Sequence, residues 1–231
     1  MNALPYFSKF VICARDVARR KSLHGFSGAL RAGWLLLVPL CAGAQEAAAV
    51  YTDKATALRF PQTLSQLRYE QLVDFGNSEL GYCIVYRAPD ALGQICVYDL
   101  GYQHVPTGVD SEAFKKALDI AVESMTKAFS RPPYANGELT GTATPSIEGG
   151  GKLAKAEMRL FASEFLPEEQ VKQRNMHMIL MTGGLGKVIK LIYTMRNPQP
   201  DAFAKETRDI VEAFVRFNGT TMKQLPVEKT Q

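Results

Sequence analysis

The sequence contains few of the residues that form most catalytic and metal centres. Its 231 residues include only three histidines and four cysteines. No two cysteines have C-x-x-C spacing and no histidines cluster, so the pattern of a zinc site is absent. The G-x-S-x-G motif of a nucleophilic serine is absent as well. We therefore predict no bound metal and no cofactor, and we expect a binding protein more readily than an enzyme.

The N-terminal part lacks an apolar run long enough to cross a bilayer. Ala32–Cys41 is uncharged and largely apolar, but its ten residues are about half of the roughly 20 that a spanning helix needs. Basic residues precede this run, and Ala42-Gly43-Ala44 follows it. This order is typical of a secretory signal peptide. We predict that residues 1–44 are the signal, that cleavage separates Ala44 from Gln45, and that no transmembrane span remains.

Two other export signals share part of this pattern. Cys41 follows apolar residues as a lipid-modified cysteine does, but Leu40 stands where bacterial lipoproteins carry Gly, Ala or Ser. Arg19-Arg20 resembles a twin-arginine signal, but Ser22 stands where that pattern has an apolar residue. We therefore predict the general secretion route to the periplasm. A lipoprotein tethered to the membrane through Cys41 is the alternative.

An excess of charge is also missing once the signal is removed. Residues 1–44 hold six basic residues and one acidic residue, which leaves 21 basic and 22 acidic residues in the mature chain. The precursor's pI of about 8.8 therefore gives no reason to expect nucleic acid or an anionic membrane as a partner. The single tryptophan, Trp34, also lies in the signal.

Two cysteines, Cys83 and Cys96, remain after cleavage, each in a strand-like run. If they lie opposite each other, Tyr86 faces Gly93 and a short turn closes through Pro89-Asp90. Directly opposed residues of adjacent strands are close enough for a disulfide, and an oxidising compartment favours it. We predict the Cys83–Cys96 disulfide, with two buried free thiols as the alternative.

The strongest structural pattern is a predicted hairpin over residues 176–195. Two apolar runs flank Gly183-Gly184, and the second run alternates between apolar and polar residues. Both parities of the first run are apolar, which predicts a strand covered on both faces near the middle of a sheet. His177 lies within this run, where a hydrogen-bonded core histidine is expected.

The remaining chain alternates strands and helices. A strand over 68–75 and the two cysteine strands precede a helix that Asp110 or Ser111 caps, with an apolar stripe from Phe114 to Phe129. Residues 137–151 are rich in glycine and are expected to form a mobile loop with at most one edge strand. A strand over 155–165 and the hairpin precede a last helix, which Asp201 caps and Asn218-Gly219 ends.

The predicted fold class is α+β. It comprises an antiparallel sheet of about six strands and two amphipathic helices, in two β-β-β-α runs. Residues 45–58 are expected to be a flexible lead-in, residues 59–219 a single domain, and residues 220–231 a polar tail.

This layout resembles the PsbP-like fold and its exported bacterial relatives. The resemblance covers residues 59–217 in outline, rests mainly on the strand pair followed by a C-terminal amphipathic helix, and has no specific motif behind it. It implies a role in binding or assembly, although a fold alone does not fix function.

Three stretches are candidates for a functional site. Gly183-Gly-Leu-Gly-Lys187 fails as a phosphate loop because its glycine spacing is wrong and Val188 follows the lysine. His104 lies in a loop just past a strand, where Asp99 and Tyr102 would be available for acid–base chemistry. The tyrosines on the cysteine strands are interpreted either as cross-strand aromatic pairs or as a sheet face that binds a ligand or partner. The predicted binding residues are Tyr86, Arg87, Tyr98, Tyr102 and His104.

The sequence therefore predicts an exported, non-enzymatic periplasmic protein that binds a protein partner or a small ligand. The alternative is a hydrolase-type enzyme that uses the His104 loop.

Overall fold

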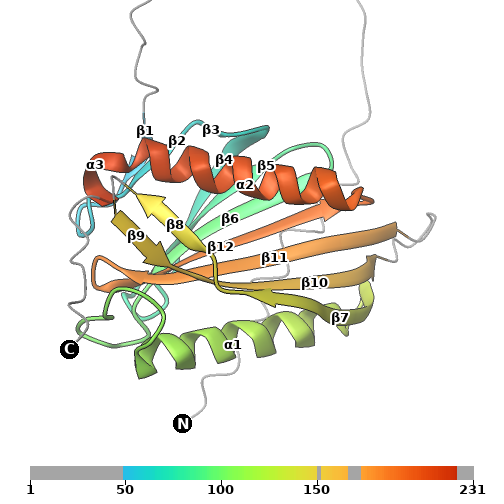
Figure 1. Ribbon diagram of the computed structural model, residues 1–231, viewed down its shortest axis with the longest axis horizontal. Coiled ribbons are helices and arrows are strands. Elements are labelled where there is room, and N and C mark those ends of the chain that lie inside the picture. Colours follow the sequence, from blue (N-terminus) through green and yellow to red (C-terminus); the bar gives the residue numbers. More distant parts are fainter. Residues whose placement is uncertain (1–48, 150–151, 166–172, 223–231) are drawn as a thin grey trace, which may run out of the picture. The chain divides into compact units, whose positions relative to one another are not determined.

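The computed structural model describes residues 49–149, 152–165 and 173–222 (Figure 1). The predicted signal peptide, Cys41 and the cleavage site between Ala44 and Gln45 lie outside these residues. Most of the predicted polar tail, residues 223–231, lies outside them too.

The central element is an eight-stranded antiparallel sheet, where about six strands were predicted. The strands of the first half of the chain and those of the second half meet where β6 pairs with β12. The order across the sheet is β3 (Thr63–Leu64), β4 (Leu67–Asp74), β5 (Tyr82–Arg87), β6 (Ala91–Tyr98), β12 (Lys187–Arg196), β11 (Gln173–Gly184), β10 (Glu157–Phe165) and β7 (Tyr134–Ala143).

Two small two-stranded sheets were not predicted. β1 (Ala49–Thr52) pairs with β2 (Arg59–Pro61), so part of the predicted flexible lead-in is a strand. β8 (Ser146–Gly149) pairs with β9 (Lys152–Lys155), where the sequence predicted mostly loop. These strands have three or four residues each, which is too short for an alternating pattern to be recognised.

The two long helices lie on opposite faces of the sheet (Figure 1). α1 (Glu112–Phe129) packs against β7, β10 and β11, whereas α2 (Pro200–Phe217) packs near β2, β3 and β8. Adjacent residues of β11 show the two sides: His177 stacks on Phe129 of α1, and Met178 points to α2. We call these the α1 face and the α2 face.

The helix ends are partly as predicted. Ser111 caps α1, and its hydroxyl accepts a hydrogen bond from the Phe114 amide at 3.2 Å. Asp201 was expected to cap α2, but it lies inside the first turn, after Pro200 at the first helical position. A carboxylate there still interacts favourably with the helix dipole. A short helix, α3 (Gly219–Met222), follows α2.

The hairpin of β11 and β12 is confirmed, but its turn lies two residues further on. Gly184 pairs with Lys187, and Leu185 and Gly186 form the turn with φ angles of 56° and 77°. Gly183 serves a different purpose, because a Cβ there would lie 2.1 Å from the Pro106 carbonyl oxygen. Its amide and carbonyl exchange two 2.9 Å hydrogen bonds with Gly108. These two hydrogen bonds hold the loop that follows β6 against the β11–β12 hairpin.

The register of the cysteine strands is as predicted. Cys83 lies opposite Cys96, and Tyr86 lies opposite Gly93. The two sulfur atoms are 2.08 Å apart, so the pair is at disulfide distance. The side chains of both cysteines are on the α1 face, because they alternate with Ile84 and Ile95 of the α2 face.

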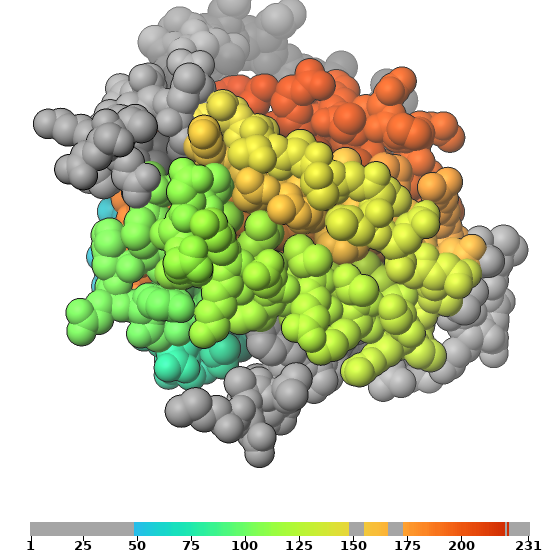
Figure 2. Space-filling view, turned by 60° about the horizontal axis from the view of Figure 1, so that its bottom comes forward, coloured from blue at the N-terminus to red at the C-terminus, as the bar shows by residue number. Residues whose placement is uncertain are grey.

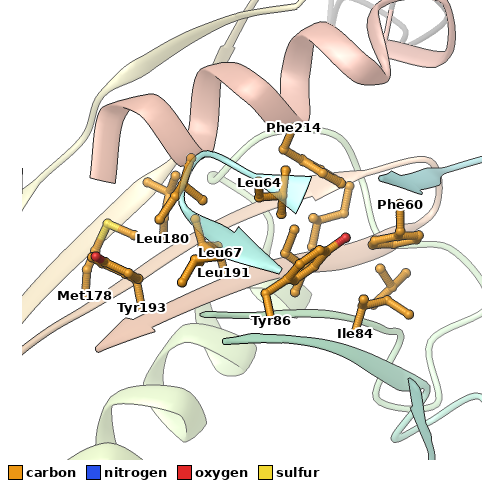
Figure 3. Close-up of a cluster of buried hydrophobic side chains, with 14 of the residues drawn as sticks. Phe60, Leu64, Leu67, Ile84, Tyr86, Met178, Leu180, Leu191, Tyr193 and Phe214 are labelled. Carbon is orange, nitrogen blue, oxygen red and sulfur yellow. The ribbon is translucent and has the colours of Figure 1, made fainter. Parts of the chain in front are cut away.

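A continuous apolar cluster fills the α2 face (Figure 3). Phe203, Ile210 and Phe214 of α2 supply its upper side, and side chains of the central strands supply its floor. Asn218 then fastens the end of α2 to β2. Its side-chain oxygen accepts from the Arg59 amide at 2.7 Å, and its amide donates to the Arg59 carbonyl at 2.9 Å.

Candidate functional site

The tyrosines predicted to form one binding surface lie on both faces of the sheet. Tyr86 is fully buried in the α2 face, whereas Tyr98 is buried on the α1 face. The reason is the register: Cys96 lies opposite Cys83, so Tyr98, two residues on from Cys96, shares the cysteine face and not that of Tyr86. Burial raises the pKa of both phenols. A shared exposed tyrosine surface is therefore not formed.

The other predicted binding residues lie nearer the surface. Arg87 is half-buried, and its Nε donates to both carboxylate oxygens of Glu70 at 2.9 Å. Tyr102 is half-buried and His104 is exposed. His104 lies over the hairpin turn, where a Cβ at Gly186 would be 3.1 Å from the imidazole Nδ1.

The carboxylate expected to orient His104 has other partners. Asp99 is 4% exposed, and its Oδ2 accepts from Lys187 Nζ at 2.6 Å. Its Oδ1 accepts from the Gly101 amide at 2.8 Å. These contacts hold the loop and the start of β12 together, so Asp99 has a structural role at this end of the sheet.

His177 is a hydrogen-bonded core histidine, as expected. The ring is fully buried, with Nε2 2.7 Å from Ser163 Oγ and Nδ1 2.9 Å from Thr194 Oγ1. Phe129 stacks on it at 3.8 Å between ring centroids, and Tyr134 meets it edge-on. Burial among these rings lowers the pKa of His177 to about 3, so the imidazole is neutral at physiological pH.

A lysine is also buried on the α1 face. Lys190 is 7% exposed, and its Nζ lies 5.0 Å from the centroid of the Tyr98 ring. Burial lowers the pKa of this ammonium group to about 8. The tyrosine ring supplies a cation–π contact that offsets part of the cost of burying the charge.

Within residues 49–149, 152–165 and 173–222, no group of three or more His, Cys, Asp or Glu side chains is placed to hold a metal ion. None of the helices in these ranges combines the length and apolarity needed to cross a bilayer.

An apolar cleft lies along α2 on the α2 face, and sequence reasoning did not identify it. Its volume is about 820 Å³, within the range of ligand pockets. Its floor is formed by Met158 of β10 and Met178 and Leu180 of β11, and Figure 3 shows the last two pointing from the strand towards α2. Pro145 and Ile147, at the start of the β8 hairpin, form the facing wall.

One side of α2 forms the remaining wall of this cleft. The residues recur every three or four positions, so they form a stripe beside the buried stripe of Phe203, Ile210 and Phe214. Figure 2 shows α2 next to β8 on the molecular surface. The residues of α2 and its C-terminal end that line the cleft are Ala204, Thr207, Arg208, Val211, Glu212, Val215, Arg216 and Gly219.

The sequence carries a partial signal for this cleft. The apolar residues of α2 extend from Phe203 round to Val211 and Val215, which is wider than one contact with a sheet requires. No short stretch of sequence predicts the opposite wall of the cleft, because that wall depends on the position of β8 relative to β10 and β11.

Comparison with known proteins gives a likeness of layout. No family model matches the chain, and no curated protein matches its sequence. Among solved structures, it is similar to the solution structure of cyanobacterial PsbP from Synechocystis, with 13% sequence identity and a TM-score of 0.37. The match covers 71% of this chain and 86% of that one. The resemblance predicted from the sequence is thus found, and it concerns the arrangement of strands and helices alone.

Proposed function

We propose that this chain is an exported, periplasmic, non-enzymatic protein that binds a small, largely apolar ligand in the α2 cleft. The observation that carries the proposal is the cleft itself: a volume of about 820 Å³, an apolar floor, and a few polar groups at its rim. Pockets with this composition are the usual sites for small ligands.

The proposed export rests on two features of the chain. Residues 1–44 have the order of a signal peptide, and Cys83 and Cys96 lie at disulfide distance. Disulfides persist in oxidising compartments, so the cysteine pair agrees with a periplasmic location.

Cell fractionation and mass spectrometry test the export. We expect the protein in the periplasmic fraction, with a mass that starts at Gln45 and is two hydrogens below that of the reduced chain. A cytoplasmic protein that retains residues 1–44 would contradict the proposal. Incorporation of labelled fatty acid at Cys41 would support the lipoprotein alternative.

Two alanines of α2 allow a matched test of binding. Ala202 and Ala204 are both exposed, but only Ala204 lines the cleft. Ala204→Trp should place an indole ring in part of the cleft and reduce the fluorescence increase of an uncharged, polarity-sensitive dye such as Nile red. Ala202→Trp should bind the dye as the wild type does.

The fluorescence of the introduced tryptophan reports on the cleft directly, because the mature chain has no other tryptophan. If the wild type fails to bind the dye, or if both variants bind it equally, the cleft is not the binding site.

A further inference from the structure

The charged residues at the rim of the α2 cleft have no partners in the described part of the chain. Arg208 and Arg216 are exposed and line the cleft, with Glu212 between them. None of these three side chains forms an ion pair or hydrogen bond with another described residue, unlike Lys205 and Asp209 on the same helix, which pair at 2.6 Å. These three rim residues therefore have a net charge of +1, and neither guanidinium group is paired with another residue of the described ranges.

A buried hydroxyl lies next to one of these arginines. Thr207 lines the cleft, and its Oγ1 is buried without a hydrogen-bond partner among the described residues. Helical threonines commonly donate to the carbonyl four residues earlier, as Thr126 of α1 does to Val122 at 2.9 Å. A buried hydroxyl without a partner is unfavourable, so a ligand that accepts a hydrogen bond from it is favoured.

Arg208 and Arg216 are about two turns apart on α2. Eight residues of helix correspond to about 12 Å along the axis. Thr207 and Arg208 both line the cleft within one turn of α2, so they form the stronger site for an anionic headgroup. A guanidinium binds carboxylate or phosphate oxygens through paired N–H groups, and a hydroxyl adds a further donor.

The floor of the cleft suits an unbranched apolar chain. Met158 and Met178 lie diagonally from each other on neighbouring strands, because Met158 pairs with Leu180 and Met178 pairs with Leu160. Methionine side chains are flexible and polarisable, so they adapt to chains of different shape.

We infer that the ligand of the α2 cleft is a single-chain amphipathic anion, such as a fatty carboxylate. Its headgroup lies at Thr207 and Arg208, and its chain lies over Met158 and Met178. This inference rests on the proposed function and adds the charge and orientation of the ligand to it.

Three probes with the same chain test the sign of the charge. Dodecanoate, dodecanol and dodecyltrimethylammonium differ in the headgroup, and each would displace Nile red from the mature protein below its critical micelle concentration. We expect dodecanoate to bind about tenfold more tightly than the ammonium, with the alcohol between them. Equal affinities would overturn this inference and leave the proposed function in place, whereas binding of none of the three would overturn both.

Three substitutions test the orientation. Arg208→Gln should weaken dodecanoate binding about tenfold and leave dodecanol unchanged, and Arg216→Gln should have a smaller effect on dodecanoate. Arg131→Gln is the matched control, because Arg131 is exposed at the end of α1 and does not line the cleft. An unchanged affinity of Arg208→Gln for dodecanoate, or an equal loss with Arg131→Gln, would show that the headgroup does not lie at Arg208.

Discussion

The two faces of the sheet are built differently. The α1 face buries polar groups and gives each ring nitrogen of His177 a hydroxyl partner. The α2 face is almost entirely apolar, yet α2 and β8 leave a cleft over Met178 and Leu180. A buried polar network has to be closed to be stable, whereas an apolar face tolerates an opening. The contrast agrees with the proposed binding on the α2 face, and it makes the α1 face the side on which stability should depend on pH.

The largest loss of stability is expected from removing the buried side chain of Phe214 on the α2 face. Phe214 is buried and lies 5.7 Å from Phe60 between ring centroids. Phe214→Ala should lower the free energy of unfolding by about 3–5 kcal/mol, because it removes buried apolar area and leaves a cavity. Urea denaturation measures this loss. A loss below about 1 kcal/mol would mean that α2 is not packed as described.

Removing the disulfide should cause the next largest loss of stability. Cys83 and Cys96 are separated by 13 positions, and closing such a loop stabilises by about 3 kcal/mol on the chain-entropy argument. The double substitution Cys83→Ala and Cys96→Ala should lose about this amount in urea denaturation, and adding a reductant should then have no further effect. If the reductant leaves the wild type unchanged as well, the two thiols are not linked.

The His177 network should make stability depend on pH. The imidazole has a pKa of about 3 in the folded protein and about 6.5 when unfolded, so the unfolded chain binds the additional proton between these values. The free energy of unfolding should therefore fall as the pH falls below 6.5, by roughly 3 kcal/mol at pH 4.5. Above pH 6.5 this group should have no effect.

Other groups also titrate in that range, so the slope is compared with that of His177→Gln. The amide keeps polar atoms in the site but does not titrate, so the difference between the two slopes belongs to His177. Identical slopes would contradict a neutral buried imidazole.

A smaller loss of stability is expected from replacing Asn218 at the end of α2. Asn218 is 1% exposed and hydrogen bonds to both backbone groups of Arg59 and to the Phe214 carbonyl. Asn218→Ala should cost about 2 kcal/mol because these buried groups lose a partner. Asn77 is a control: its side chain accepts from the Leu80 amide in an exposed turn, and Asn77→Ala should cost well under half as much.

The smallest effect should come from filling the cleft. Ala204→Trp should change the free energy of unfolding by less than about 0.5 kcal/mol, since the site is open. The same change at Ala117 of α1, which is 1% exposed, should cost about 3 kcal/mol through overpacking. Similar values at the two positions would remove the distinction between an open and a closed face.

Much of the fold was predictable from the sequence because its strongest signals are local. Placing Cys83 opposite Cys96 predicted the register of β5 and β6 correctly. The spacing of apolar residues predicted both long helices. The cap of α1 was narrowed to Asp110 or Ser111 for the same reason, and Ser111 is the residue that caps it. The short strands β1, β8 and β9 were missed, since each is fixed by a partner strand and not by its own pattern.

The site was less predictable than the fold. The tyrosine pattern identified residues that do lie on the sheet, but the face of each follows from pairing register, and this buries Tyr86 and Tyr98 on opposite sides. The cleft depends on contacts between α2, β8 and β11, which no short stretch of sequence contains. The turn of β11 and β12 was misplaced because Gly183 is required by the distant Pro106 and not by the turn.

The contact between Asn218 and Arg59 also bears on how the chain is made. The two residues are 159 positions apart, and a ribosome completes β2 long before it reaches Asn218. Until then Leu58 and Phe60, both fully buried in the finished domain, have no α2 to cover them. Until α2 has been synthesised, a nascent chain of this protein therefore exposes apolar surface that chaperones and proteases recognise.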